Sequence, residues 1–217
     1  MHSSISNLEF VKKEIIRSNT NHEKINIIAV SKTFKLNQIK PLIDYGHTHF
    51  GENKIQESID KWSEIKKNMN NLKLHFIGKL QTNKVKYVIP LFDYIHSLDS
   101  IKLAEKIYNQ QNKVNFKPKI FVQVNIGAEQ QKSGVLINDL EIFLKDCKKH
   151  FNLNIIGLMC IPPIGNSSEK YFKEMQQLNK IYNFDDLSMG MSSDYLDAVK
   201  YGSSYVRIGS KIFGNRV

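Results

Sequence analysis

Short apolar runs recur along the chain, and most are rich in β-branched or aromatic residues. Eight such runs cover residues 25–30, 48–50, 72–77, 94–97, 120–124, 155–159, 187–189 and 205–208. Most end at Gly, Asn, Ser or Asp. Near-continuous apolar runs of this length are typical of strands that are buried on both faces of a parallel sheet. The pattern therefore predicts eight parallel strands.

Amphipathic stretches with helical spacing precede and separate these runs. Residues 4–17 place Ile5, Leu8, Val11 and Ile15 on one helical face, which predicts a first helix within residues 1–20. Similar apolar stripes predict helices over residues 100–110, 138–150 and 168–182. Ser100 stands where a helix N-cap is expected.

Eight strands separated by helices indicate consecutive βα units with right-handed crossovers. Eight is also the number of units that closes a TIM-type (β/α)8 barrel. We therefore predict an α/β chain with one domain over residues 1–217, in which the N-terminal helix precedes a barrel over residues 25–217. The alternative is an open doubly wound sheet, but the chain lacks the glycine-rich dinucleotide signals of that fold.

Length and composition agree with one folded domain. A chain of 217 residues buries roughly 70% of its unfolded surface, so it needs no disulfide framework. Cys147 and Cys160 have no CxxC spacing and are expected in the core. Glu9 and Glu14 interrupt the N-terminal apolar residues, and no run is long enough for a membrane helix. We expect a cytoplasmic monomer.

The net charge of +10 raises the question of a nucleic-acid partner. However, 28 of the 31 basic residues are lysines scattered along the chain, and no dense basic block occurs. We therefore expect a solvated basic surface and no nucleic acid, with a nucleic-acid-binding module kept as an alternative. The scarcity of arginine makes Arg17, Arg207 and Arg216 candidates for positions that require a guanidinium.

In a barrel, reactive residues gather at the carboxyl ends of the strands. Lys32 directly follows the first predicted strand, where partial burial favours the neutral amine that attacks carbonyl groups. Asn53 and His75 lie near the ends of the second and third strands and supply neutral hydrogen-bonding groups. His47 and His49 face one side of a strand, but no third ligand has suitable spacing, so we expect no metal.

The last two strand ends carry the pattern of a phosphate site. Met191 and Ser192 follow the seventh predicted strand, whereas Gly209 and Ser210 follow the eighth. The corresponding loops of barrel enzymes often bind phosphate through backbone N–H groups and hydroxyls. Capping by residues 192–194 alone is the simpler alternative. Arg207, on the last strand, would need acceptors when buried.

An amine nucleophile, a phosphate site and an arginine together suit pyridoxal 5′-phosphate. Seven motifs occur in order: IAVSKT (28–33), HFGEN (49–53), HFIG with LQ and NK (75–84), KSG (132–134), GLM (157–159), LSMGMS (187–192) and VRIG with IFG (206–214). They closely resemble the YggS/PROSC family of pyridoxal phosphate homeostasis proteins. The resemblance runs from about residue 28 to residue 216.

The resemblance implies a barrel like the N-terminal domain of alanine racemase, with pyridoxal phosphate held as a Schiff base on Lys32. Arg207 would face the pyridine nitrogen, and Lys132 would assist cofactor transfer. The full implied set of cofactor-binding residues is Lys32, Asn53, His75, Met191, Ser192, Arg207, Gly209 and Ser210. Lys79 and residues 127–131 depart from the usual family pattern. These departures affect contacts at the rim of the barrel and not the Schiff base on Lys32.

The same resemblance favours a carrier over an enzyme. Arginine can only donate, so Arg207 would keep the pyridine nitrogen unprotonated and weaken the ring as an electron sink. The chain ends at Val217, where alanine racemase continues into a second domain that completes its active site. We expect a protein that holds pyridoxal phosphate and passes it to apo-enzymes. A small pyridoxal phosphate-dependent amino-acid racemase is the alternative.

Overall fold

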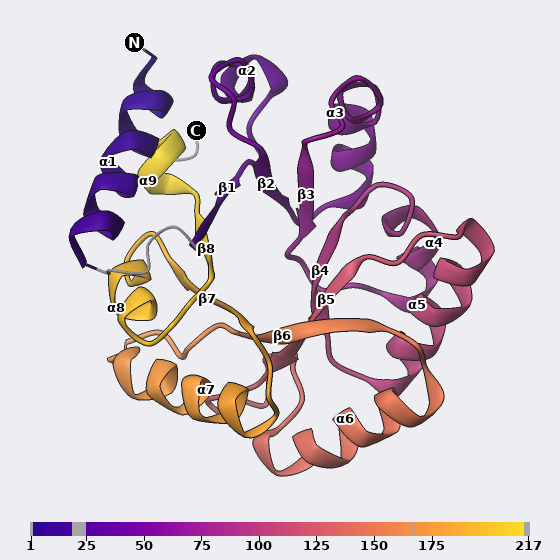
Figure 1. Ribbon diagram of the computed structural model, residues 1–217. Coiled ribbons are helices and arrows are strands. Elements are labelled where there is room, and N and C mark those ends of the chain that lie inside the picture. The colour runs from indigo at the N-terminus through magenta and orange to yellow at the C-terminus, as the bar shows by residue number, and fades with distance from the viewer. Residues whose placement is uncertain (1, 19–24, 166, 215–217) are drawn as a thin grey trace.

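Eight parallel strands close into a barrel in the order of the sequence (Figure 1). The computed structural model describes residues 2–18, 25–165 and 167–214. The strands are β1 Asn26–Val30, β2 His49–Glu52, β3 Lys73–Phe76, β4 Tyr94–Leu98, β5 Lys119–Val124, β6 Asn154–Cys160, β7 Asp186–Met191 and β8 Tyr205–Ile208. Because β1 pairs in parallel with both β2 and β8, the predicted barrel is confirmed and the open-sheet alternative is wrong.

Helices surround the barrel on its outside (Figure 1). They are α1 Ser3–Ser18, α2 Leu36–Asp44, α3 Ile55–Asn68, η2 Thr82–Lys84, α4 Val85–Val88, α5 Ile101–Val114, α6 Ile137–His150, α7 Glu169–Ile181, α8 Tyr195–Lys200 and α9 Ser210–Phe213. The predicted cap of α5 is confirmed, because Ser100 Oγ accepts the Leu103 N–H at 3.3 Å. Residues 19 and 20 of the predicted first helix, together with Arg216, lie outside the described residues.

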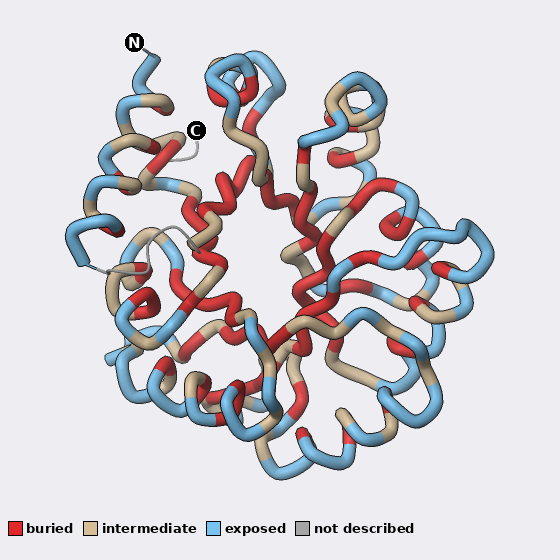
Figure 2. Tube along the Cα trace, in the orientation of Figure 1, coloured by how far each residue is buried: buried red, intermediate tan, exposed pale blue. Residues whose placement is uncertain are grey.

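Burial follows two layers, and the strands form an almost continuous buried ring (Figure 2). The larger layer lies between the strands and the helices, where residues such as Phe50 and Trp62 are inaccessible to solvent. A second cluster comprises Ile28, Tyr94, Phe121, Met159 and Tyr205. Its members come from strands around the barrel and form an apolar cluster of their own.

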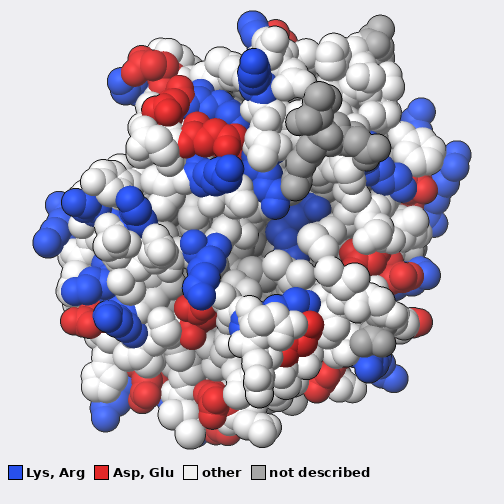
Figure 3. All heavy atoms as spheres, turned by 180° about the vertical axis from the view of Figure 1, so that it is seen from behind, with Lys and Arg blue, Asp and Glu red and all other residues white. Residues whose placement is uncertain are grey.

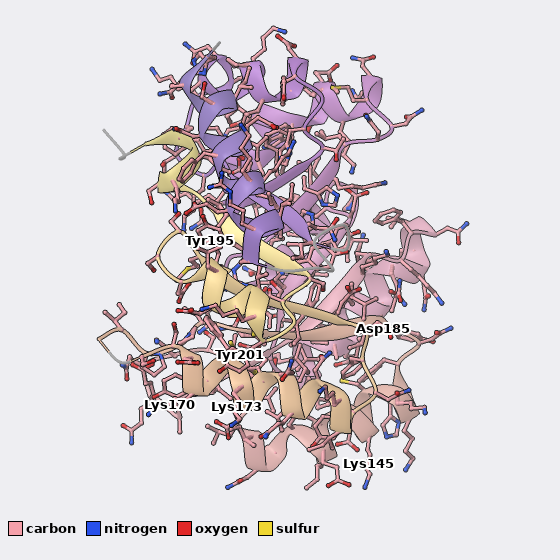
Figure 4. The ribbon with its side chains drawn as sticks, turned by 60° about the vertical axis from the view of Figure 1, so that its left-hand side comes forward. Lys145, Lys170, Lys173, Asp185, Tyr195 and Tyr201 are labelled. Carbon is pink, nitrogen blue, oxygen red and sulfur yellow. The ribbon has the colours of Figure 1, made fainter. Side chains whose placement is uncertain are left out.

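Helix α1 is attached to the helices that follow the last two strands. Its apolar face is buried through Leu8 and Val11. Glu14 accepts hydrogen bonds from Lys211 Nζ, at 2.9 Å, and from the Tyr195 hydroxyl. Figure 4 shows Tyr195 on α8 beside α1. These contacts join the N-terminal helix to the segments that carry the predicted phosphate loops.

Both cysteines are free and buried, as expected. Burial raises the pKa of the Cys147 and Cys160 thiols to about 12, so neither is a thiolate near neutral pH. Among the described helices, none combines the length and apolar character needed to cross a membrane. Within the same part of the chain, no three His, Cys, Asp or Glu side chains are grouped to hold a metal ion.

Candidate functional site

A cavity of about 500 Å³ opens at the carboxyl ends of β1, β7 and β8. Its walls are formed by Val30, Lys32, Phe34, Ile77, Ile161, Met191, Ser192, Ser193, Arg207, Gly209, Ser210 and Gly214. Six of the eight residues expected to bind the cofactor therefore meet at one place. The face of the molecule seen in Figure 3 is hollowed near its middle, with basic side chains in and around the hollow.

Lys32 stands at a backbone turn that the fold holds in place. The next residue, Thr33, has a φ of 71°, a left-handed conformation that is a genuine outlier for a β-branched residue. Its N–H donates to Glu57 Oε1 on α3 at 2.8 Å. A strained conformation of this kind persists only where neighbouring groups fix it. The turn thus orients the chain immediately after the amine-bearing residue.

The buried carboxylate of Glu52 stabilises the same turn through Ser31, the residue before Lys32. Glu52 Oε1 accepts hydrogen bonds from Ser31 Oγ at 2.8 Å, Lys61 Nζ at 2.9 Å and Trp62 Nε1 at 3.0 Å. Lys61 Nζ also donates to the Ser31 carbonyl at 3.0 Å. Because Glu52 is wholly buried and Lys61 is only 6% exposed, this ion pair is screened little by solvent. Two helix-α3 side chains and Glu52 therefore fix the residue before Lys32.

These supporting residues were missed by reasoning from the sequence. Glu52 belongs to the HFGEN motif, and that was the available signal. Glu57 and Lys61 gave none, because their spacing on a helix is also that of an ordinary surface ion pair. Only the packing of α3 against the end of β1 shows that they act on the lysine turn.

The loop after β7 and the turn after β8 meet through one hydroxyl. Ser192 Oγ accepts the backbone N–H groups of Gly209 at 3.3 Å and Lys211 at 3.4 Å. Gly190, which precedes this loop, has a φ of +89° and a Cβ position only 2.6 Å from Ala198 Cβ. A side chain at this position would therefore be both strained and obstructed. Backbone donors thus already converge on an oxygen atom at this side of the cavity.

Arg207 is buried, and neutral oxygens accept its hydrogen bonds. Its NH1 group donates to the Ser188 carbonyl at 2.8 Å and to Ser188 Oγ at 2.7 Å, and NH2 donates to the Cys160 carbonyl at 2.8 Å. The expectation that it needs acceptors is confirmed. Burial lowers the pKa of the guanidinium, but arginine starts so high that it stays protonated. Three of its five N–H groups are used in these bonds, and the other two have no hydrogen-bond partner among the residues that the structure describes.

Three predicted residues do not line the cavity. His75, expected at the rim, is instead fully buried and hydrogen-bonded to His49 and His96. The reason is its position on β3, where its side chain points inward. Asn53 lies outside the lining, but its Oδ1 is buried and has no hydrogen-bond partner among the described residues. Lys132 donates to the Pro162 carbonyl at 3.0 Å from the loop after β5.

A larger cavity, of about 880 Å³, lies elsewhere on the barrel. It is formed by residues of α6, α7 and the segments that lead into β6 and β7, including His150, Leu153 and Tyr182. It therefore lies toward the amino ends of these strands, where barrels carry stability and not chemistry. The smaller cavity brings an amine, a guanidinium, hydroxyls and backbone N–H groups together. Such groups can bind a small phosphorylated carbonyl compound.

Comparisons with known proteins identify relatives of the whole chain. Residues 8–217 match the family described as alanine racemase, N-terminal domain. A pyridoxal phosphate homeostasis protein from Haemophilus influenzae is 35% identical, with 97% of this chain and 94% of the relative covered. The solved structure of PipY from Synechococcus elongatus PCC7942 with pyridoxal phosphate bound is 31% identical. It has a TM-score of 0.79 and covers 94% of this chain and 100% of that chain.

A third comparison shows the fold at greater distance. An alanine racemase from Clostridium difficile is 17% identical, with a TM-score of 0.73. The match covers 97% of this chain and 57% of that one. At this identity the similarity concerns the barrel alone.

Proposed function

Because the chain belongs to the alanine racemase N-terminal domain family and, within it, to the pyridoxal phosphate homeostasis proteins, we propose that it binds pyridoxal 5′-phosphate on Lys32 and passes it to apo-enzymes without turnover. The observation that carries this proposal is the meeting of Lys32, Arg207 and the Ser192–Gly209 contact around one cavity. A volume of about 500 Å³ lies within the usual range for small-ligand sites.

Lys32 supplies the covalent bond in this proposal. Its neutral amine adds to the aldehyde carbon of the cofactor, and one water molecule leaves as the Schiff base forms. Addition of water reverses the reaction and releases both partners unchanged. The bond therefore suits storage, since it lowers the free aldehyde concentration without consuming the cofactor. The turn held by Glu57 keeps the amine directed into the cavity.

The other lining residues would hold the two ends of the cofactor. The phosphate would contact Ser192, Gly209 and Ser210, with Met191 alongside, because backbone donors already converge there. Arg207 would donate one of its remaining N–H groups to the pyridine nitrogen. A donor at that nitrogen keeps it unprotonated, and bound pyridoxal phosphate is then a weaker electron sink for carbanion chemistry.

The composition of the cavity supports a carrier. Among the described residues that line it, only Lys32 and Arg207 have ionisable side chains. Racemisation needs proton exchange on both faces of a substrate carbon, and among the described residues of this lining only Lys32 can take up and return a proton. A small amino-acid racemase is the competing function. Lys132, which is occupied by the Pro162 carbonyl, would act later, during transfer of the cofactor.

The covalent assignment is tested by borohydride reduction of the loaded protein, followed by peptide mass mapping. The reduced adduct is expected on the peptide that contains Lys32. Lys32→Ala should abolish the visible absorption of the bound cofactor, whereas Lys35→Ala, three residues away at the start of α2, should keep it. An adduct on another lysine, or an unchanged spectrum in Lys32→Ala, would overturn the assignment.

Turnover is tested by incubating the loaded protein with L-alanine in deuterated water. A carrier should leave the alanine unracemised, and its Cα should gain no deuterium beyond the level of free pyridoxal phosphate. Racemisation with deuterium incorporation at many turnovers per protein would establish the racemase instead.

The phosphate assignment is tested at Gly209, where two substitutions separate size from charge. Its φ is not in the left-handed region, and an added Cβ would lie 3.5 Å from Val30 Cβ, an ordinary contact. Gly209→Ala should therefore bind pyridoxal phosphate almost normally. Gly209→Asp should weaken binding by at least about tenfold, since the carboxylate repels the phosphate. Equal affinities of the two variants would place the phosphate elsewhere.

A further inference from the structure

A continuous line of hydrogen-bonded side chains crosses the interior of the barrel and ends at Arg207. His49 Nδ1 lies 2.9 Å from His75 Nε2, and His75 Nδ1 lies 2.9 Å from His96 Nε2. His96 Nδ1 then lies 2.8 Å from Ser188 Oγ, which accepts from Arg207 NH1 at 2.7 Å. We refer to His49, His75, His96 and Ser188 as the histidine chain.

The histidine chain links two cavities. At one end, Arg207 lines the cavity proposed to hold pyridoxal phosphate. At the other end, His49 lines a cavity of about 470 Å³ that also includes Asn26 and Thr48. Asn26 begins β1 and Thr48 precedes β2, so this second cavity lies at the amino ends of the strands. The chain thus runs from one end of the barrel to the other.

Aromatic rings hold the buried histidines in place. The Tyr94 ring stacks on His75, with centroids 4.1 Å apart and an interplanar angle of 15°. The Phe121 ring stacks on His96 at 4.5 Å and 27°. His75, His96 and Ser188 are wholly inaccessible to solvent. Within the barrel, each ring nitrogen of His75 and His96 therefore meets one polar partner of the chain.

Arg207 fixes the direction of every hydrogen bond in the chain. A guanidinium only donates, so Ser188 Oγ accepts from Arg207 and has its own proton to give. The available acceptor is His96 Nδ1, which leaves the His96 proton on Nε2. His96 then donates to His75 Nδ1, and His75 donates through Nε2 to His49 Nδ1. All three histidines are consequently Nε2–H tautomers.

The opposite direction is costly at its buried end. If His96 Nδ1 donated to Ser188, the serine proton would have no acceptor among the described residues, and a buried unsatisfied hydroxyl is destabilising. The Nδ1–H dipole would also point its positive end at the guanidinium. His49, which lines a cavity, can exchange a bond with water in either direction. The direction of the hydrogen bonds is therefore set at the buried end of the histidine chain, at Ser188 and Arg207.

The histidines are neutral, as this arrangement requires. Burial holds the pKa of His75 and His96 well below 6.5 and lowers that of His49 to about 4. Neutral imidazoles in this order align their Nδ1 acceptor sides toward Arg207. Asp194 acts on the Arg207 charge from a distance, and the groups that hydrogen-bond to the guanidinium are two backbone carbonyls and the Ser188 hydroxyl at the end of the histidine chain.

We propose that Ser188, His96, His75 and His49 are positioning residues for Arg207: the chain aligns neutral dipoles that orient the guanidinium in the cofactor cavity. The inference rests on the proposed function only in its last step, the effect on pyridoxal phosphate. Its first part, the tautomer order set by Arg207, concerns the protein without cofactor.

The first test is nitrogen-15 NMR of the cofactor-free protein labelled at histidine. His49, His75 and His96 are each expected to show the Nε2–H tautomer at neutral pH. Arg207→Met and Ser188→Ala should both convert His96 and His75 to mixed tautomers, because each removes the group that sets the direction. Nδ1–H tautomers in the wild type, or unchanged tautomers in both variants, would overturn the proposal.

The second test is the visible spectrum and affinity of the protein loaded with pyridoxal phosphate. Ser188→Ala should shift the absorption maximum and weaken binding by about tenfold, whereas Ser188→Thr should restore both by returning the hydroxyl. Ser203→Ala is a matched control. Ser203 is also buried, but it donates to the Met189 carbonyl and is not a member of the histidine chain.

Substitutions at His49, the end of the histidine chain farthest from Arg207, give the most specific form of this test. His49→Leu should produce a smaller spectral shift in the same direction, and His49→Gln should reverse it by restoring an acceptor for His75. His47→Gln should have no effect, since His47 hydrogen-bonds to the backbone of His49 and Ile27 and not to a member of the histidine chain. Spectra identical to wild type in both Ser188→Ala and His49→Leu would refute the positioning role. If the wild-type protein takes up no pyridoxal phosphate, the proposed function fails. The NMR tautomers of the cofactor-free protein then still test the hydrogen-bond order of the histidine chain.

Discussion

The backbone N–H of Thr33 donates to Glu57 Oε1 across 2.8 Å, and this contact ties the residue after Lys32 to helix α3. Thr33 has a left-handed backbone that its branched side chain disfavours. Lys61 donates to the same carboxylate oxygen at 3.0 Å. The position of Lys32 therefore depends on side chains from a helix that does not line the cavity.

Glu57→Ala is expected to loosen this turn. Loss of a charge-assisted hydrogen bond should lower the free energy of unfolding by about 1–2 kcal/mol, because the Thr33 N–H loses its acceptor. Pyridoxal phosphate should also bind more weakly in an absorbance titration. Glu64→Ala on the same helix is the control, since Glu64 is 80% exposed. Equal binding by both variants would contradict a role for Glu57 in holding Lys32.

Lys61→Met is expected to be strongly destabilising. It leaves the carboxylate of Glu52 buried without a cation, which typically costs about 3–5 kcal/mol. Urea unfolding should show the loss, and adding Glu52→Gln should recover part of it by removing the unpaired charge. Lys67→Met, which breaks an exposed pair with Glu64, should cost less than about 1 kcal/mol. If Lys61→Met and Lys67→Met cost the same, the Glu52 pair is not stabilising.

Stability is expected to fall as the pH is lowered from about 6.5 toward 4. Burial lowers the pKa of His47 and His49 from 6.5 to about 4, and it lowers that of His75 and His96 further. In this window the unfolded chain binds more protons than the folded protein, so acid favours unfolding. Each histidine can contribute a slope of at most about 1.4 kcal/mol per pH unit.

Urea midpoints measured between pH 7 and pH 5 check this expectation. His47→Gln should reduce the slope of stability against pH by no more than the contribution of one histidine, about 1.4 kcal/mol per pH unit. The contributions of His49, His75 and His96 should remain. A midpoint that does not change between pH 7 and pH 5 would show that the buried histidines are not neutral in the folded state.

Gly190→Ala is expected to disturb both stability and the loop after β7. Gly190 and Gly46 both have positive φ, at +89° and +92°. An added Cβ meets Ala198 Cβ at 2.6 Å in the first case and nothing within 4 Å in the second. Gly46→Ala should therefore show only conformational strain of about 1 kcal/mol. Gly190→Ala should lose more in thermal unfolding and should weaken cofactor binding. Equal losses would mean that the α8 contact is not close.

Much of the barrel could be predicted from the sequence because strand burial and helix amphipathicity are local properties. The eight apolar runs became the eight strands, the predicted helices α1, α5, α6 and α7 were found, and Ser100 caps α5 as predicted. Helices α2 and α3 go beyond the three interstrand helices that the pattern predicts. Pro41 lies inside α2, where proline disfavours a helix, and the buried residues of α3 are Ser58 and Trp62, so packing against the barrel supplies much of their stability.

Most residues of the candidate site could also be predicted from the sequence, but His75 could not. Lys32, Met191, Ser192, Arg207, Gly209 and Ser210 could be placed because a parallel barrel brings the carboxyl ends of its strands together. His75 was placed at the rim because a residue one position from a strand end can face the mouth or the interior. The register of β3 against β2 and β4 decided for the interior.

By itself, the sequence determined the eight-unit barrel, the lysine at its mouth and the loops around the cavity, because each follows from periodicity and residue type over a few neighbouring positions. Only the tertiary structure decided which distant side chains touch. His96 and Ser188 are 92 residues apart and meet at 2.8 Å because barrel closure brings β4 and β7 together across the interior. Such contacts depend on strand register and closure, which local patterns do not encode.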